Sequence, residues 1–217
     1  NPISAEYDGC FVRRVSHSSA EDPQDGRIDG LEARDAAVLT RIGDGVQPLD
    51  AVLNTRLETR SLQRLLARGL VQLSSVTPSD ASHVLGLATF WDCAAARKAL
   101  QLFGRRRAGA GESFAKDPVV MARAIVDQLT RQTELALLET AFDAEETPFG
   151  LSGAQLAQHV LMQRGLDGHR GLLALNTGLN VPVIGLGASA STYYPAVGAR
   201  LGCEIILSRH AGVANAI

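Results

Sequence analysis

The sequence has few cysteines, and those it has form no recognised pattern. Cys10, Cys93 and Cys203 are far apart, odd in number and include no C-x-x-C pair. This lack argues against a zinc site, so no metal-ligating residues are expected in the chain. Because unpaired thiols are typical of a reducing compartment, we expect a cytoplasmic protein.

Long apolar runs and an excess of charge of one sign are lacking as well. No run approaches the ~20 apolar residues that span a bilayer, so no membrane partner is expected. The 21 lysines and arginines nearly balance the 23 aspartates and glutamates. The formal net charge of −2 argues against general attraction to nucleic acid, while leaving room for a local patch.

What is present is the composition of an ordinary globular protein. With 217 residues, of which 46% are hydrophobic, the chain can bury a core as one domain or two small ones. It opens abruptly at "NPISAEYDG" and stops within "HAGVANAI", whereas natural ends are usually polar. We therefore expect a fragment of a longer protein, with a strand and linker over 1–30, a winged-helix-like helical segment over 31–76 and an α/β subdomain over 77–217.

The first two segments predict a strand followed by a small helical unit. Gly9–Val15 is strand-like, and the polar residues up to position 30 predict a loop. We expect helices over 31–42, around 48–54 and from a cap at Thr55 or Thr59 to Gly69, and then a half-buried strand over 70–76. Helix, short helix, helix and strand in this order are typical of a winged helix.

Four arginines are spaced four apart on the third predicted helix and form one basic stripe, Arg56, Arg60, Arg64 and Arg68. In a DNA-binding winged helix this element enters the major groove. That interpretation makes the chain a non-enzymatic regulator, which binds DNA through this segment and senses a small molecule through the α/β part. The other interpretation is the solvated face of a packing helix, and the balanced net charge favours it.

The third segment has the pattern of an α/β subdomain. Thr77 or Ser79 suits the N-cap of a helix that begins at Pro78. We expect a second helix from about Trp91 and a long one over 118–142. Continuous apolar runs over 172–175, 182–186 and 204–207 predict three strands that are covered on both faces.

The turn "GLGAS", which follows the second of these strands, is the best candidate for a ligand site. Gly185 and Gly187 let the backbone approach a ligand, while Ala188 and Ser189 keep the space open. Pro195 is expected to open the next helix, whose free N–H groups favour an anion. The spacing G-x-G-x-x-A also satisfies the dinucleotide fingerprint, although the late helix start argues against it. A tight turn without any ligand is the third interpretation.

Three stretches resemble the hydantoinase/oxoprolinase A-type proteins of the actin-like ATPase superfamily. They are "TPSDASHVLG", "WDCAAARKALQLFGRR" and "VPVIGLGASASTYYPAVGARLGCEIILSRHAGVANAI". The resemblance is best over 70–217. It implies an α/β fold with a partial actin-like (ribonuclease H-like) core and mixed sheet, next to the helical winged-helix-like segment.

The resemblance also implies a function. The intact protein would use ATP and Mg²⁺ to activate a cyclic amide for hydrolysis, with a second hydantoinase-type subunit or a homo-oligomer as partner. Gly185, Gly187, Ala188 and Ser189 would form the adenosine side of the nucleotide cleft. Asp80 in "TPSD" would be catalytic, although an aspartate there also suits a helix cap. The superfamily's Asp-Gly-Gly-Thr-like phosphate hairpin is not found in the 217 residues, so we expect this chain alone to be inactive.

Overall fold

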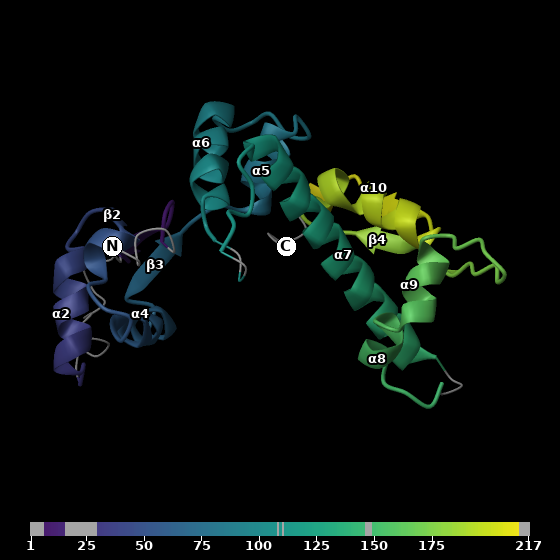
Figure 1. Cartoon of the computed structure of the whole chain (residues 1–217), viewed down its shortest axis with the longest axis horizontal. Helices are drawn as coiled ribbons and strands as arrows, with labels where there is room; N and C mark the ends of the chain where they lie inside the picture. Colours follow the sequence, from purple (N-terminus) through teal and green to yellow (C-terminus); the bar gives the residue numbers. More distant parts are fainter. Residues whose placement is uncertain (1–6, 16–29, 108, 110, 146–148, 213–217) are drawn as a thin grey trace. The chain divides into compact units, whose positions relative to one another are not determined.

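The computed structural model describes residues 7–15, 30–107, 109, 111–145 and 149–212, and they form a mixed α/β structure in which helices dominate (Figure 1). The broad α/β class is therefore confirmed. The chain divides into two compact units, one of residues 1–84 with 92–121 and one of residues 85–91 with 122–217. Each unit is described by itself. The predicted segments 1–30, 31–76 and 77–217 stay a prediction, and the expected loop before residue 30 lies mostly outside the described residues.

The first unit contains a three-stranded antiparallel sheet in the order β2-β1-β3. Its elements are β1 (Phe11–Arg14), α2 (Ala33–Ile42), β2 (Gln47–Pro48), α3 (Leu49–Val52), α4 (Glu58–Ala67), β3 (Val71–Ser74), α5 (Pro78–Val84) and α6 (Cys93–Gly104). The middle strand precedes all the helices in sequence, and Val12 in it pairs with both Gln47 and Leu73. The predicted strand at 9–15 and the helix at 31–42 are thereby confirmed.

The core of this sheet and its helices follows from alternation in the strands and helical spacing in α2 and α4. Val12 and Val71 point inward and are buried, as are Ile42 and Leu65. The other face of β1 remains open, and Phe11 there is 37% exposed. The strand predicted over 70–76 is confirmed as β3. Only Val71 in it is buried, so buried and exposed residues do not alternate along this strand.

The start of α4 differs from the prediction. The helix begins at Glu58, and the N-cap residue Leu57 has no side-chain cap, so the predicted capping by Thr55 or Thr59 is wrong. Instead, the carboxylate of Glu58 accepts hydrogen bonds from the backbone N–H groups of Asn54 and Thr55, at 2.7 and 3.3 Å. These two donors belong to the segment before the helix, so the Glu58 side chain fixes the chain that leads into α4 and does not replace a threonine N-cap.

The second unit contains most of the long helix α7 and a parallel pair of short strands. Its elements are α7 (Pro118–Ala144), α8 (Gly153–Ala157), α9 (Val160–Leu166), β4 (Val183–Gly185), α10 (Ala190–Leu201) and β5 (Ile205–Leu207). Leu138 of α7 packs with Ala157, Val197 and Leu201 in a buried cluster. The strands predicted over 182–186 and 204–207 are confirmed, but the prediction that they are covered on both faces is wrong, because Ile184 is 63% exposed and Ile206 and Leu207 are exposed as well. The helices α8 and α9 were not anticipated.

The strand predicted over 172–175 is wrong. These residues form a turn in which Arg170 and Ala174 make an isolated antiparallel bridge. Leu172 is completely exposed and Leu173 is 65% exposed. The apolar run was taken for a buried strand, but periodicity alone cannot tell a buried run from an exposed one.

Candidate functional site

The candidate site is the turn of residues 186–189, which joins β4 to α10. In the parallel register Gly185 lies opposite Leu207, so the carboxyl ends of β4 and β5 meet at one edge. Figure 1 shows α10 lying against β4, and the path from β4 through α10 to β5 is a strand–helix–strand unit. Ligands of open α/β sheets bind outside the carboxyl ends of the strands, and this edge is where the turn lies.

Gly187 holds the turn in a conformation that only glycine adopts easily. Its φ of +103° lies in the left-handed range. Its N–H donates to the carbonyl of Ala211 at 2.8 Å, and its own carbonyl accepts from the N–H of Ala190 at 3.1 Å. The turn is therefore tied to the segment after β5 and to the start of α10. The N–H of Gly187 is already occupied and is not offered to a ligand.

Gly185 is required by packing. A Cβ at this position would lie 2.6 Å from the ring of Tyr194 and 2.6 Å from a methyl group of Leu207. The same close approach recurs at Gly198 in α10, where a Cβ would lie 2.4 Å from Ile205. Both glycines therefore allow α10 to lie close to the strands, and this need exists without any ligand.

Ala188 and Ser189 face solvent in the turn, as does Leu186, which is 54% exposed. Both small residues are exposed, and Ser189 is the N-cap of α10 without a side-chain cap. The first N–H groups of a helix lack intrahelical acceptors, and the positive end of the helix dipole favours an anion there. These two small residues form an open surface beside a helix start.

The expected helix start at Pro195 is wrong. The helix α10 begins at Ala190, and Pro195 lies inside it. Proline is tolerated early in a helix, but here it stands in the second turn and removes one backbone hydrogen bond. The delayed start had argued against a dinucleotide fingerprint, and that argument no longer holds.

Arg209 and His210 are two further candidates at this edge. Both follow β5 and are exposed. Because β5 ends beside β4, they leave the sheet at the same edge as the turn. The pairing of the two strands therefore adds a cationic side chain, Arg209, and a hydrogen-bonding imidazole, His210, for an anionic ligand.

Asp80 belongs to the first unit, where it completes a helix cap. Its carboxylate accepts from the backbone N–H of Thr77 at 2.8 Å and from the Thr77 hydroxyl at 2.7 Å. The backbone N–H of Asp80 lies 3.4 Å from the Thr77 hydroxyl oxygen, which makes the pair reciprocal, as in a capping box. His83 is buried in the same helix, with its Nδ1 2.6 Å from the carbonyl of Ser79. The geometry around Asp80 is that of a cap.

The arginine stripe of the alternative function is only partly available to a partner. Arg56 precedes α4 and Arg68 is its C-cap residue, so only Arg60 and Arg64 lie within the helix. Arg64 binds the buried carboxylate of Asp35 through Nε at 2.8 Å and Nη2 at 2.6 Å. The hydrogen bonds from Arg64 lower the pKa of Asp35, against a smaller opposing effect of burial. Arg64 is therefore part of the protein's own structure.

A further hollow, of about 510 Å³, lies on the sheet of the first unit. Phe11, Val46 and Leu73 give it an apolar wall, and Arg13 donates to the side-chain carbonyl of Gln72 across it. Apart from this arginine, no titratable side chain lines it. It offers a surface for contact but no constellation for catalysis.

Within the described residues, no group of three or more histidine, cysteine, aspartate or glutamate side chains is placed to hold a metal ion. In the same part of the chain, every helix is too short or too polar to cross a bilayer. No family model matches the sequence, and no curated protein or solved structure is similar enough to count as a match.

Proposed function

We propose that the turn between β4 and α10 forms the adenosine side of a nucleotide cleft in an ATP-dependent, hydantoinase/oxoprolinase-like cyclic amide hydrolase. The observation that carries the proposal is the strand, glycine turn and helix start at the carboxyl edge of two parallel strands. The resemblance of the same residues to that family supplies the choice of nucleotide and substrate.

In this proposal Ala188 and Ser189 provide a flat, small-residue wall for the adenosine. Gly185 and Gly187 act indirectly. Gly185 lets α10 approach β4, and Gly187 provides the positive φ that the turn requires. Arg209 supplies positive charge for phosphate oxygens, and His210, which leaves the sheet at the same edge, supplies a ring N–H donor. The wall binds and orients the nucleotide; it does not take part in bond making.

The chemistry proposed for the assembled enzyme is activation of an amide oxygen. Transfer of the terminal phosphoryl group from ATP to that oxygen, with release of ADP, would activate the carbonyl carbon. Water would add to this carbon, the ring C–N bond would break as the nitrogen takes up a proton, and a second water would release phosphate from the resulting acyl phosphate. Mg²⁺ would neutralise the charge of the phosphates in transfer. The residues that hold the phosphates and the ion would be supplied elsewhere in the assembled enzyme, since the phosphate hairpin is not found in these 217 residues.

The proposed wall is tested by titration of the protein with ATP and Mg²⁺ in a calorimeter. Ala188→Asp places a negative charge on the exposed turn without changing a glycine, and we expect at least a tenfold loss of affinity, or about 1.4 kcal/mol. Ala196→Asp is the matched control, because Ala196 is exposed on α10, the helix that follows the turn. Equal affinity of the two variants would refute the wall.

Asp80 is tested separately, because a cap and a catalytic group respond differently to substitution. Asp80→Asn and Thr77→Ala should each lower the stability of the first unit by about 1 kcal/mol if the residue only caps α5. A catalytic Asp80 requires in addition that ATP-dependent ring opening is lost in Asp80→Asn but retained in Thr77→Ala.

A second candidate function is the DNA-binding or small-molecule-sensing regulator. The observation in its favour is the order of α2, β2, α3, α4 and β3 in the first unit, which is compatible with a winged helix. Arg56 and Arg60 are exposed there, whereas Arg64 is engaged by Asp35. A gel shift with duplex DNA at low salt tests it, and absence of any shift refutes it.

A further inference from the structure

Basic residues are concentrated in one stretch of the first unit, although the whole chain carries a net charge of −2. Between Cys93 and Lys116 there are six basic residues and one acidic residue, Glu112. The six are Arg97, Lys98, Arg105, Arg106, Arg107 and Lys116. This stretch comprises α6 and the hairpin that follows it. The local excess of positive charge is the kind of patch that a net charge near zero conceals.

The exposed face of α6 presents part of this charge in one row. Lys98, Gln101 and Arg105 recur at helical spacing, and all three are exposed. With Leu102 they line a shallow hollow of about 370 Å³. Arg97 is exposed beside them. The row contains no acidic side chain.

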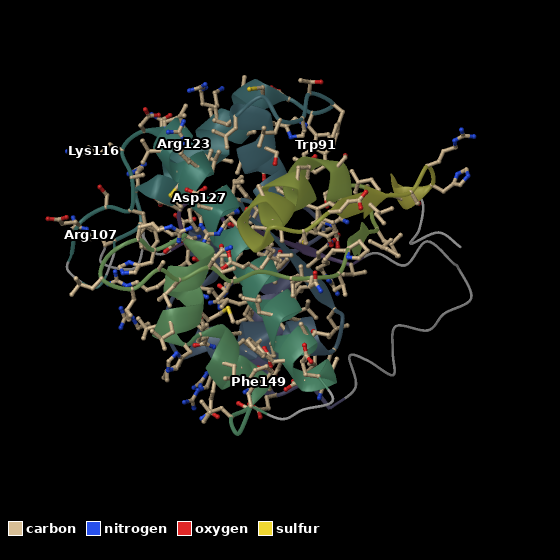
Figure 2. The ribbon with its side chains drawn as sticks, turned by 90° about the vertical axis from the view of Figure 1, so that its right-hand side faces the viewer. Trp91, Arg107, Lys116, Arg123, Asp127 and Phe149 are labelled. Carbon is tan, nitrogen blue, oxygen red and sulfur yellow. The ribbon has the colours of Figure 1, made fainter. Side chains whose placement is uncertain are left out.

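The hairpin after α6 extends the row. Its backbone returns to the helix, because the N–H of Ala115 donates to the carbonyl of Gly104 at 3.1 Å. A Cβ at Gly104 would lie 2.5 Å from the Ala115 carbonyl oxygen, so this approach requires glycine. Lys116 therefore lies next to the C-terminal end of α6, where Arg105 is the C-cap residue. Figure 2 shows Arg107 and Lys116 projecting away from the ribbon.

Most of these cations are not neutralised by the protein. In the part of the chain that the structure describes, no carboxylate lies within ion-pair distance of Arg97, Lys98 or Lys116. Arg105 makes one long contact with Asp8, at 3.5 Å, and stays 66% exposed. Arg106 donates to the Cys10 sulfur and lies over the Phe103 ring. Arg107 donates to the carbonyl of Gly111 at 3.3 Å, so it is engaged by a neutral group of the hairpin and not by a carboxylate.

An aromatic ring accompanies the charge. Phe114 in the hairpin is 52% exposed and stacks on Phe103, with the ring centroids 6.3 Å apart. The ring is thus supported on one side while half of its surface meets solvent. Exposed aromatic rings among arginines and lysines suit the unpaired bases of a single strand.

We propose that α6 and its hairpin form a binding surface for single-stranded nucleic acid. Phosphates would contact Arg97, Lys98, Arg105, Arg107 and Lys116, and a base would stack on Phe114. A folded protein partner fits this surface less well, because the cores of such interfaces are depleted of charged side chains, whereas Lys98 and Arg105 flank Leu102, an apolar side chain that lines the hollow. The proposal is independent of nucleotide binding at the β4–α10 turn.

The test is fluorescence anisotropy of the full chain with labelled 20-nucleotide dT and rU strands over a series of KCl concentrations. Lys98→Glu/Arg105→Glu should weaken binding at least tenfold at 50 mM KCl. It should also reduce the slope of log affinity against log salt by about 1.4, which corresponds to two lost phosphate contacts. Phe114→Ala should weaken binding by roughly fivefold or more. Circular dichroism of each variant checks that the fold is retained.

The control is Arg123→Glu/Arg131→Glu, which changes the charge of the chain by the same amount at two exposed positions of α7. Its affinity should stay within about threefold of the parent. Equal loss in both double variants would overturn the assignment to α6, as would absence of binding at 50 mM KCl. Tighter binding of duplex DNA or of a poly-glutamate peptide than of the single strands would overturn the choice of ligand.

Discussion

Arg200 on α10 donates from its Nε to the carboxylate of Glu134 on α7, with 2.5 Å between the two atoms. Glu134 is fully buried, and its other carboxylate oxygen has no hydrogen-bond partner. A second nitrogen of Arg200 reaches Asp167 at 3.3 Å. One arginine thus compensates a buried charge and joins α7 to α10 and to the end of α9.

This pair predicts an asymmetric response to substitution. Arg200→Met should lower the free energy of unfolding by about 3 kcal/mol, because it leaves the Glu134 carboxylate buried without a counter-charge. Glu134→Leu/Arg200→Met should recover most of that loss, since removal of both charges leaves nothing uncompensated. Urea denaturation followed by the fluorescence of Trp91, the sole tryptophan, measures both. A double variant as unstable as Arg200→Met would contradict this account.

The pair of Arg64 and Asp35 predicts acid sensitivity of the first unit. Because the hydrogen bonds from Arg64 lower the pKa of Asp35 in the folded state, the pair stabilises the fold at pH values above the unfolded pKa of about 4. That stabilisation is lost as pH falls through the lower, folded pKa. Asp35→Asn should cost about 2 kcal/mol at pH 7 and progressively less below pH 4.

Asp44→Asn is the matched control for this prediction. Asp44 is fully exposed and lies 3.7 Å from Arg14, so its substitution should change stability by less than about 0.5 kcal/mol at any pH. Urea denaturation between pH 2.5 and pH 7 distinguishes the two. A pH-independent cost of Asp35→Asn would show that the carboxylate does not act through its charge.

Sequence patterns predicted the helices and their ends correctly where the determining residues lie within a few positions of one another. Helices with clear periodicity were predicted near their true bounds, and so were the ends marked by Gly43 and Gly69, which have positive φ. The patterns failed where the outcome depended on distant partners. The apolar run around Leu172 has no strand to pair with, and Pro195 is carried inside α10 because that helix packs on β4 and β5.

In the candidate site, too, the sequence predicted the local features and missed those that depend on residues far apart in the chain. The sequence identified the turn and its glycines, but it could not show that Gly185 is needed for contact with Tyr194, nine residues later. Nor could spacing show that Arg209 emerges at the same edge, since that follows from the pairing of β4 with β5. Arg64 was assigned to a solvent-facing stripe because Asp35, its partner, lies on another helix.

The packing of Gly185 predicts that a single methyl group is harmful there. Gly185→Ala should destabilise the second unit by about 1–3 kcal/mol, because the added Cβ would overlap the ring of Tyr194. Tyr194→Leu in the same background should reduce this cost, and a double-mutant cycle measures the coupling. Gly187→Ala should also destabilise, by about 1–3 kcal/mol, through its positive φ. That cost should not respond to Tyr194→Leu, so equal coupling of both glycines to Tyr194 would contradict the distinction.

Cys93 and Cys203 are predicted to react with a thiol reagent in a defined order. Cys93 is exposed and should react first, whereas burial raises the pKa of Cys203 and lowers its thiolate fraction at neutral pH. Mixing with a chromogenic disulfide at pH 7.5 should give a fast phase that Cys93→Ser removes and a slow phase that Cys203→Ser removes. The slow phase should accelerate with rising pH, and it should become fast in urea because unfolding exposes the thiol. If Cys203 reacts as fast as Cys93 in the folded protein, the burial of Cys203 against the α7–α10 cluster is wrong.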